Sequence, residues 1–167
     1  MLGKSGSGKD HLLRGLIKSG LRYSPKFTTR PKRSKETEGV EYNFITNSDF
    51  ERMEKQNLIL THQTFLIGEE IWHYGISREN FEKNQVFIMT PHEFSQLSET
   101  DMTNTFIVYL DIDYETRKNR ISKRNDSSDS IDRRMAADEI DFSGFNTYDL
   151  KITDPEFEPE WVYDFMV

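Results

Sequence analysis

The chain has 167 residues, with 22 Lys and Arg against 29 Asp and Glu, a formal net charge of −7 and no cysteine. The lack of cysteine excludes disulfides, Cys-ligated zinc, iron–sulfur clusters and thiol catalysis, and the acidic balance argues against a general binder of nucleic acid or anionic membranes. No apolar run approaches the ~20 residues of a membrane span, and the first residues have no apolar signal segment. We therefore expect a soluble, cytoplasmic globular protein.

The first half of the chain begins with glycines and continues with apolar residues at helical spacing. Residues 12–17 predict a helix, with Gly20 as its C-terminal cap. After a polar and basic stretch, residues 42–45 predict a short strand. Ser48 and Glu51 have the spacing of a capping box, which predicts that a short helix begins there.

The second half contains two continuous apolar runs. Residues 86–89 and 106–110 each predict a strand that is buried on both faces. Thr90, Pro91 and Glu93 combine a cap, a first-turn proline and an acid, and so predict a helix start between these strands.

The remaining elements continue the alternation. Asp113 is expected to cap a basic helix, 125–130 to form a loop, 150–152 a last short strand and 161–166 the apolar stripe of a terminal helix. Because strands and helices alternate, the predicted class is α/β with a mainly parallel sheet.

The glycine-rich segment fits the first seven positions of the phosphate-loop pattern G-x-x-x-x-G-K-S/T. Glycines let backbone N–H groups turn towards phosphate oxygens, the lysine reaches the outer phosphates, and the following helix adds its positive dipole end. The alternative is a flexible turn before a helix with no role in phosphate binding. The spacing of the glycines and the lysine disfavours it. The predicted phosphate-binding residues are Gly3, Lys4, Ser5, Gly6, Ser7, Gly8 and Lys9.

The segment departs from that pattern in two ways. Asp10 stands where the pattern has a hydroxyl that ligates magnesium; it could hold the metal as a carboxylate ligand or serve only as an acid in the first helical turn. Met1 and Leu2 alone precede the loop. Either the chain begins late, or its first strand is vestigial.

A basic segment carries a second phosphate signature. Its pattern, which resembles the monophosphate-binding signature of guanylate kinases, is Arg30-x-x-Arg33-x-x-Glu36-x-x-Gly39-x-x-Tyr42-x-Phe44. Tyr74 and Gly75 are similar to that family's Tyr-Gly element, and Arg120, Arg124 and Arg134 resemble its lid arginines. The likeness covers most of the chain.

This resemblance implies a three-layer P-loop NTPase fold with a small monophosphate-binding insertion and a helical lid. The implied division is 1–25 core, 26–78 insertion, 79–117 core, 118–134 lid and 135–167 core. It implies ATP and Mg²⁺ as donor and cofactor, with Lys9, Arg124 and Arg134 as catalytic residues. Asp10 and Arg120 join the phosphate loop in binding ATP, and the residues that hold the acceptor's phosphate are Arg30, Arg33, Tyr42 and Tyr74.

The positions with which guanylate kinases read guanine differ in this chain. The serine, the glutamate and the aspartate of that family are replaced at or near Lys26, His62 and Thr90. The N1–H and the amine of guanine need a carboxylate acceptor, so the loss of the family's base-reading residues should weaken base discrimination. An apparent insertion offers Glu69 and Glu70 as substitutes.

The sequence therefore predicts phosphoryl transfer from ATP to a nucleoside monophosphate, with GMP or dGMP as the default acceptor. Two alternatives stay open. One is a kinase for another acceptor, such as a different deoxynucleotide or ribose 1,5-bisphosphate; the other is a non-catalytic guanylate-kinase-like binding module. The expected partners are small-molecule nucleotides, not nucleic acid or membrane, and the expected state is a monomer or a homodimer.

Overall fold

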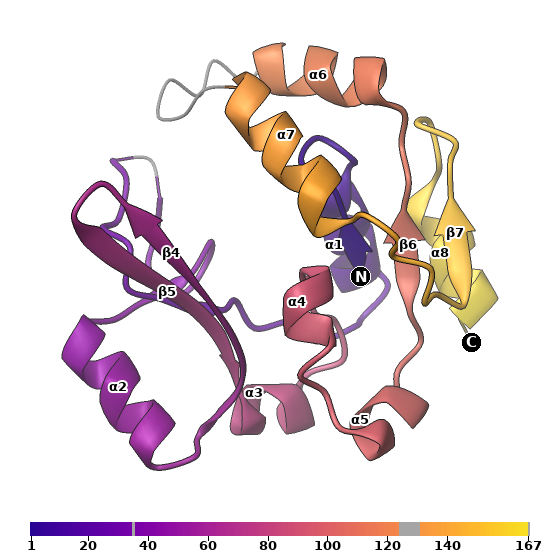
Figure 1. The fold of residues 1–167 in the computed structure, drawn as a ribbon. Coiled ribbons are helices and arrows are strands. Elements are labelled where there is room, and N and C mark those ends of the chain that lie inside the picture. The colour runs from indigo at the N-terminus through magenta and orange to yellow at the C-terminus, as the bar shows by residue number, and fades with distance from the viewer. Residues whose placement is uncertain (35, 124–130, 167) are drawn as a thin grey trace.

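The computed structural model describes residues 1–34, 36–123 and 131–166 (Figure 1). Its core contains a three-stranded parallel sheet of order β1-β6-β7. The core elements are β1 (Leu2–Gly3), α1 (Lys9–Lys18), α3 (Arg78–Lys83), α4 (Pro91–Phe94), α5 (Glu99–Thr103), β6 (Val108–Leu110), α6 (Tyr114–Lys123), α7 (Ile131–Asp141), β7 (Leu150–Ile152) and α8 (Pro159–Met166).

A second sheet lies to one side of this core (Figure 1). Its strand order is β3-β2-β5-β4, with β2 parallel to β3 and antiparallel to β5, and with β4 and β5 forming a long hairpin. Its elements are β2 (Phe27–Thr28), β3 (Asn43–Phe44), α2 (Asn47–Lys55), β4 (Ile59–Ile67) and β5 (Glu70–Ser77).

The core sheet has helices on both faces because β6 is apolar on both of its sides. Val108 and Leu110 point towards Leu12 and Leu16 of α1 and Val162 of α8. The alternate residues Ile107 and Tyr109 pack with side chains that include Leu2, Met89, Phe94 and Phe142. A strand that is apolar on both faces is typical of a parallel sheet covered by helices on both sides, whereas a sheet with one face in solvent would alternate apolar and polar residues. The predicted parallel sheet is confirmed.

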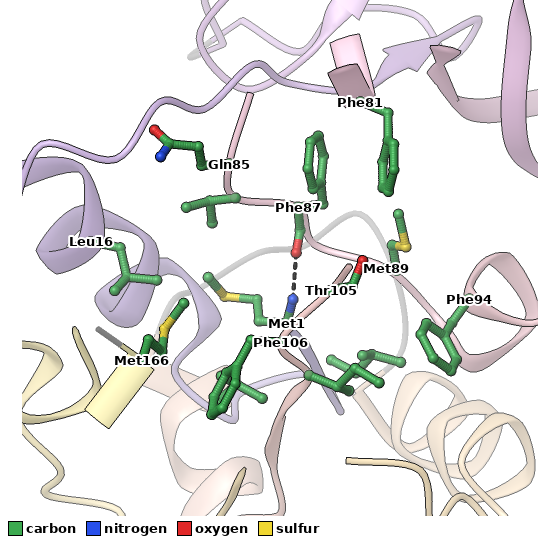
Figure 2. A pocket seen from close by; sticks show the side chains of 14 residues that line it. Met1, Leu16, Phe81, Gln85, Phe87, Met89, Phe94, Thr105, Phe106 and Met166 are labelled. Carbon is green, nitrogen blue, oxygen red and sulfur yellow. Dashed lines mark hydrogen bonds between the residues drawn. The ribbon is translucent and has the colours of Figure 1, made fainter. Parts of the chain in front are cut away.

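Residues 86–89 do not form the strand that was predicted for them. Val86 makes an isolated parallel bridge to Tyr23, the amide of Met89 donates to the Met1 carbonyl at 3.1 Å, and the Met1 amine donates to the Phe87 carbonyl (Figure 2). The segment runs beside β1, but these ladders are too short for a regular strand. Beside it lies an apolar cavity of about 50 Å³ lined by residues such as Leu16 and Phe106.

The start of α2 differs from its prediction by two residues. Thr46, not Ser48, is the N-cap: its side chain accepts from the amide of Asp49, whose carboxylate completes the capping box. Asp49 is the acid in the first turn, and from the third position it reaches back to the cap. The prediction that Thr90 and Glu93 open a helix is confirmed, although α4 is only four residues long.

Gly15 brings α1 against α8. A Cβ built on Gly15 would lie 2.0 Å from Cβ of Pro159, a distance that no folded side chain tolerates. Gly15→Ala should therefore lower the free energy of unfolding by about 1–3 kcal/mol, although alanine favours the helix itself. Urea denaturation measures this loss. Arg14→Ala, at an exposed position of the same helix, is the control and should shift stability by less than about 0.5 kcal/mol. An unchanged Gly15→Ala protein would contradict the packing.

Candidate active site

The phosphate loop joins β1 to the first turn of α1. Gly6 and Gly8 have φ angles of 76° and 100°, in the left-handed region that favours glycine. Gly8 is also the N-cap of α1, and a Cβ on Gly6 would lie 2.6 Å from the Arg117 carbonyl oxygen. The backbone conformation thus favours glycine at Gly8, a position that the motif specifies, while conformation and close contact both require it at Gly6, which stands at one of the motif's variable positions.

Two side chains of the loop are suited to a phosphate ligand. The Lys9 ammonium lies back across the loop and donates to the carbonyls of Gly3 at 2.6 Å and Lys4 at 2.9 Å. Ser7 is fully buried, and its Oγ has no hydrogen-bond partner among the described residues. A buried hydroxyl of this kind is typically satisfied by a ligand or by water. The loop therefore fits an anionic group with several oxygens.

Arg120 of α6 lies against this loop. Its Nη2 donates to the Pro155 carbonyl at 2.6 Å and its Nη1 to the Gly6 carbonyl at 3.4 Å. One guanidinium thus bridges the loop and the segment that follows β7. This position is compatible with the predicted contact to ATP.

Two carboxylates of α7 also contact the loop. Asp138 accepts from the amide of Ser5 at 2.7 Å, and Glu139 accepts from the Lys4 ammonium at 2.5 Å. Glu139 also accepts from the buried Arg117 at 2.7 Å. The hydrogen bond from Lys4 and then that from Arg117 lower the pKa of Glu139. Helix α7 therefore neutralises positive charge at one end of the loop.

Arg30 and Glu36 form the centre of the second phosphate signature. Nη2 and Nη1 of Arg30 donate to the two oxygens of Glu36 at 2.6 and 3.0 Å, a bidentate ion pair. The Glu36 carboxylate also accepts from the amide of Arg33 at 2.8 Å. Although burial opposes the charge, hydrogen bonds with Glu36 and Tyr74 raise the pKa of Arg30. This cation stays charged and fixed in direction.

Tyr42 and Tyr74 complete this cluster. The Arg30 guanidinium carbon lies 5.4 Å from the centroid of the Tyr42 ring, and the two tyrosine rings meet edge to face at 5.6 Å. Gly75 follows Tyr74 because a Cβ there would lie 3.0 Å from the Thr61 carbonyl and 3.1 Å from Phe50. The structure therefore brings Arg30, Tyr42 and Tyr74 together, as a site for one phosphate group requires.

Three tyrosines give the folded protein a distinct alkaline titration. Burial raises the pKa of Tyr23, Tyr42 and Tyr109 from 10.0 to about 12, with help from Asp111 at Tyr109. The folded state thus prefers the protonated phenols, so their contribution to stability is complete below pH 10 and is lost as the pH rises to about 12.

We expect part of the tyrosinate absorbance of the native protein to appear only near pH 12, and the free energy of unfolding to fall across this interval. The protein in urea is the control, since its tyrosines should titrate together. A native titration that superimposes on the control would contradict the burial of these phenols.

Lys26 and Thr90 lie together beside the cluster of Arg30, Tyr42 and Tyr74. The Lys26 ammonium donates to both oxygens of Glu93, at 2.6 and 2.5 Å, and Glu93 is fully buried. Glu93 also accepts from the amide of Thr90 at 2.8 Å, and the Thr90 hydroxyl donates to Oε1 of Gln63 at 2.9 Å. Gln63 lies directly opposite Tyr74 in the β4–β5 ladder.

The other three residues predicted for base recognition lie elsewhere. His62 lies on the opposite face of β4 from Gln63, where its ring packs edge to face on Phe50 of α2. Glu69 is exposed in the hairpin turn, and Glu70 is an exposed residue that accepts from Trp72 at 2.9 Å. The expectation placed all of them at one pocket; the alternation of side chains along β4 and the length of the hairpin keep them apart from Lys26.

Four predicted residues remain. Arg124 lies outside the described residues. Arg134 lies half-buried on α7, Arg33 lies exposed in the segment after β2, and Asp10 is exposed at the second position of α1. Among the described residues no group of three or more His, Asp or Glu side chains could hold a metal ion. A magnesium ion at Asp10 would therefore depend on phosphate and water oxygens for its other ligands.

The roles of several residues of this region were not predicted from the sequence. Glu36 stands in the monophosphate-binding signature, in the three-residue phase of the arginines, but no role was assigned to it. Arg117, Asp138 and Glu139 carry no local signal, since charged residues on a helix are usually solvated. Gln63 could be placed only with the hairpin register known.

The comparisons with known proteins agree with this geometry. A sequence model of the family described as guanylate kinase matches residues 1–162. The chain belongs to the guanylate kinase family. The guanylate kinase of Rickettsia felis is 31% identical over 163 residues, covering 92% of this chain and 83% of that protein. The guanylate kinase of Histophilus somni is 32% identical over 168 residues, covering 92% of this chain and 78% of that protein.

A solved structure shows the same fold. The crystal structure of guanylate kinase from Anaplasma phagocytophilum has a TM-score of 0.66 and 18% identity, and covers 99% of this chain and 81% of that chain. The α/β class and the P-loop NTPase fold are thereby confirmed. Membership of the guanylate kinase family makes the chain a nucleotide-binding phosphotransferase with a phosphate group as acceptor. None of its described helices is long and apolar enough to cross a membrane.

Proposed function

We propose that this guanylate kinase family member transfers a phosphoryl group from ATP to a nucleoside monophosphate, with GMP and dGMP as the first acceptors to test. One observation carries the proposal: the chain combines an intact phosphate loop with a separate, preformed grip for one phosphate, made by Arg30, Tyr42 and Tyr74. A binding module would need one phosphate site, whereas a transferase must hold a donor and an acceptor.

On the donor side, the backbone of Gly6, Ser7 and Gly8 would bind the β-phosphate at the N-terminus of α1. Lys9 would leave the carbonyls of Gly3 and Lys4 and follow the transferring group. Its ammonium compensates negative charge as the bond from γ-phosphorus to the bridging oxygen breaks and ADP departs.

On the acceptor side, Arg30, with Arg33, Tyr42 and Tyr74, would orient the acceptor phosphate so that one oxygen attacks the γ-phosphorus in line. The Tyr42 phenol, whose pKa burial raises to about 12, is protonated at neutral pH and can donate a hydrogen bond to that phosphate. Little covalent chemistry is left to the protein, because positioning and charge compensation supply most of the rate enhancement.

Mg²⁺, when bound, would neutralise charge between the donor phosphates. Asp10, at the second position of α1, would ligate it directly or through water, because a carboxylate is a hard-oxygen ligand. Because Asp10 would contact the metal and not the ribose or the base, Asp10→Ala would change the Mg²⁺ dependence of turnover more than the affinity for the acceptor.

We further propose the division expected from the sequence: a core in 1–25, 79–117 and 135–167, an insertion in 26–78 and a lid in 118–134. Arg134, with Arg124 outside the described residues, would close over the donor phosphates. Closure would exclude water, which otherwise competes with the acceptor. The separate β2–β5 sheet and the contacts of Arg120 with the loop support this division.

The test is ADP formation from Mg-ATP with a panel of GMP, dGMP, AMP, CMP, UMP, dTMP and ribose 1,5-bisphosphate. We expect stoichiometric ADP and nucleoside diphosphate with at least one nucleotide acceptor. Activity confined to ribose 1,5-bisphosphate would reassign the acceptor class. The absence of turnover with every acceptor, together with undetectable ATP binding by calorimetry, would overturn the proposal in favour of the binding module.

A further inference from the structure

The Lys26–Glu93 ion pair lies where the base of a bound acceptor would reach. In the β2–β5 ladder Thr28 pairs with Tyr74, and Lys26 comes two residues before Thr28, so both share one strand face with Tyr74. Two residues of strand span about 7 Å. A nucleotide whose phosphate is held by Arg30 and Tyr74 would extend its base along this face towards Lys26, Gln63 and Thr90.

The carboxylate at this place is enclosed by the protein, since the Glu93 side chain is 1% exposed and forms an ion pair with Lys26. Glu93 Oε2 accepts from Lys26 and from the Thr90 amide. Oε1 accepts from Lys26 at 2.6 Å and has no other hydrogen-bond partner within the part of the chain that the structure describes. Lys26 is itself largely buried, with its side chain 16% exposed. The pair is therefore a fixed part of the wall that Lys26, Gln63 and Thr90 form, and not a loose surface contact.

The polar groups left over have a different character from a carboxylate. An ammonium carries three donors, and two of those of Lys26 are used by Glu93, so one remains. The Gln63 amide presents its other group beside Thr90. Thr61, two residues from Gln63 on the same strand face, is buried with no hydrogen-bond partner for Oγ1 among the described residues. A buried polar atom of this kind points to a ligand or water in this wall.

Guanine recognition needs acceptors at this wall. The N1–H and the 2-amino group of guanine are both donors, and each loses its hydrogen bonds if it is buried against another donor. A site that pairs with such donors can reject an analogue without them by about 10⁴-fold. A site whose carboxylate is already paired has no such means.

We infer that the Lys26–Glu93 pair determines base specificity, because it withholds the Glu93 carboxylate from the acceptor base and leaves the 2-amino group of guanine unread. The inference rests on the proposed function. Lys26 is thus a specificity-determining residue that acts through Glu93, and this site accepts purine monophosphates with and without the 2-amino group. Guanine and hypoxanthine share the carbonyl acceptor that the remaining Lys26 donor can contact.

The experiment compares GMP with IMP, which differs from GMP only in lacking the 2-amino group. For the unmodified enzyme we expect kcat/KM values within about 3-fold of each other. In Lys26→Ser the serine is too short to hold Glu93, so Oε1 becomes available and the GMP to IMP ratio should rise at least about 10-fold, mainly through KM for GMP. Lys26→Arg keeps a cation against Glu93 and should leave the ratio unchanged.

Two measurements keep the outcome decisive. Calorimetric binding of GMP and IMP without ATP should show the same ratios, because the effect is one of binding. If Lys26→Ser does not fold, Glu93→Gln serves instead: its GMP to IMP ratio should stay within about 3-fold of the parent. A parent enzyme that prefers GMP by about 30-fold or more, a folded Lys26→Ser with an unchanged ratio, or a selective loss of GMP in Glu93→Gln would each overturn the inference. Lack of turnover with every acceptor would instead contradict the proposed function.

Discussion

Lys9→Met should reduce kcat about 1,000-fold with the best acceptor, because it removes a preorganised cation from the developing charge of the transferring phosphoryl group. Methionine keeps the length and most of the apolar contact of lysine. The lost interactions in the resting protein are two hydrogen bonds to the carbonyls of Gly3 and Lys4, which water can replace in part. Steady-state ADP release and thermal unfolding should therefore show a large catalytic loss with a small change in stability.

Lys18→Met is the matched control for this prediction. Lys18 lies exposed in the last turn of the same helix, so its loss should change kcat by less than about 2-fold. If Lys9→Met retained turnover within about 5-fold of the parent, the phosphate loop would not be the site of transfer.

Arg30→Ala should raise the KM for the acceptor and lower kcat/KM by about 100- to 1,000-fold, with little effect on the KM for ATP. Each charge-assisted hydrogen bond from Arg30 to the acceptor phosphate is worth about 1.5–3 kcal/mol. Every 1.4 kcal/mol changes a binding or rate constant about tenfold. Arg30→Lys keeps the charge but loses the planar fork, so its loss should lie between that of the parent and that of alanine.

Arg52→Ala provides the comparison for Arg30. Arg52 also pairs with an acid, Asp49, at 2.7 Å, but its side chain is 65% exposed on α2. Its removal should leave both KM values unchanged. An Arg30→Ala enzyme whose two KM values rise equally would show that the substitution disturbs the whole fold rather than one phosphate site.

Much of the core could be predicted because its signals are local. Apolar runs at 106–110 and 150–152, the helical spacing of 12–17 and the cap at Thr90 each depend on residues close in the chain. The β4–β5 hairpin escaped prediction although Gly68 at the first turn position suits a two-residue hairpin loop. Phe65, Leu66 and Ile71 are apolar residues that remain exposed, so they obscure the alternation of buried and exposed residues that indicates a strand. The strand predicted for residues 86–89 is not formed, because a buried apolar segment becomes a regular strand only where it also has neighbouring strands to pair with.

The candidate site divides in the same way. Lys9 and Arg30 belong to fixed-spacing motifs, so the sequence alone located them. The base pocket depends on which face of β4 a residue occupies, and a single step of register separates His62 on the α2 side from Gln63 opposite Tyr74. Sequence spacing could name Lys26 and could join Thr90 to Glu93 at a helix start, but the contact of Lys26 with the same carboxylate required the folded structure.

The carboxylates of Asp138 and Glu139 change what nucleotide binding at this loop means. The amide of Ser5 and the ammonium of Lys4 already hold one acidic group each. A phosphate that claims these donors takes them from α7, so the event is an exchange of one anion for another. The measured affinity is then the difference between the affinity of the loop for the nucleotide phosphate and its affinity for the two carboxylates of α7.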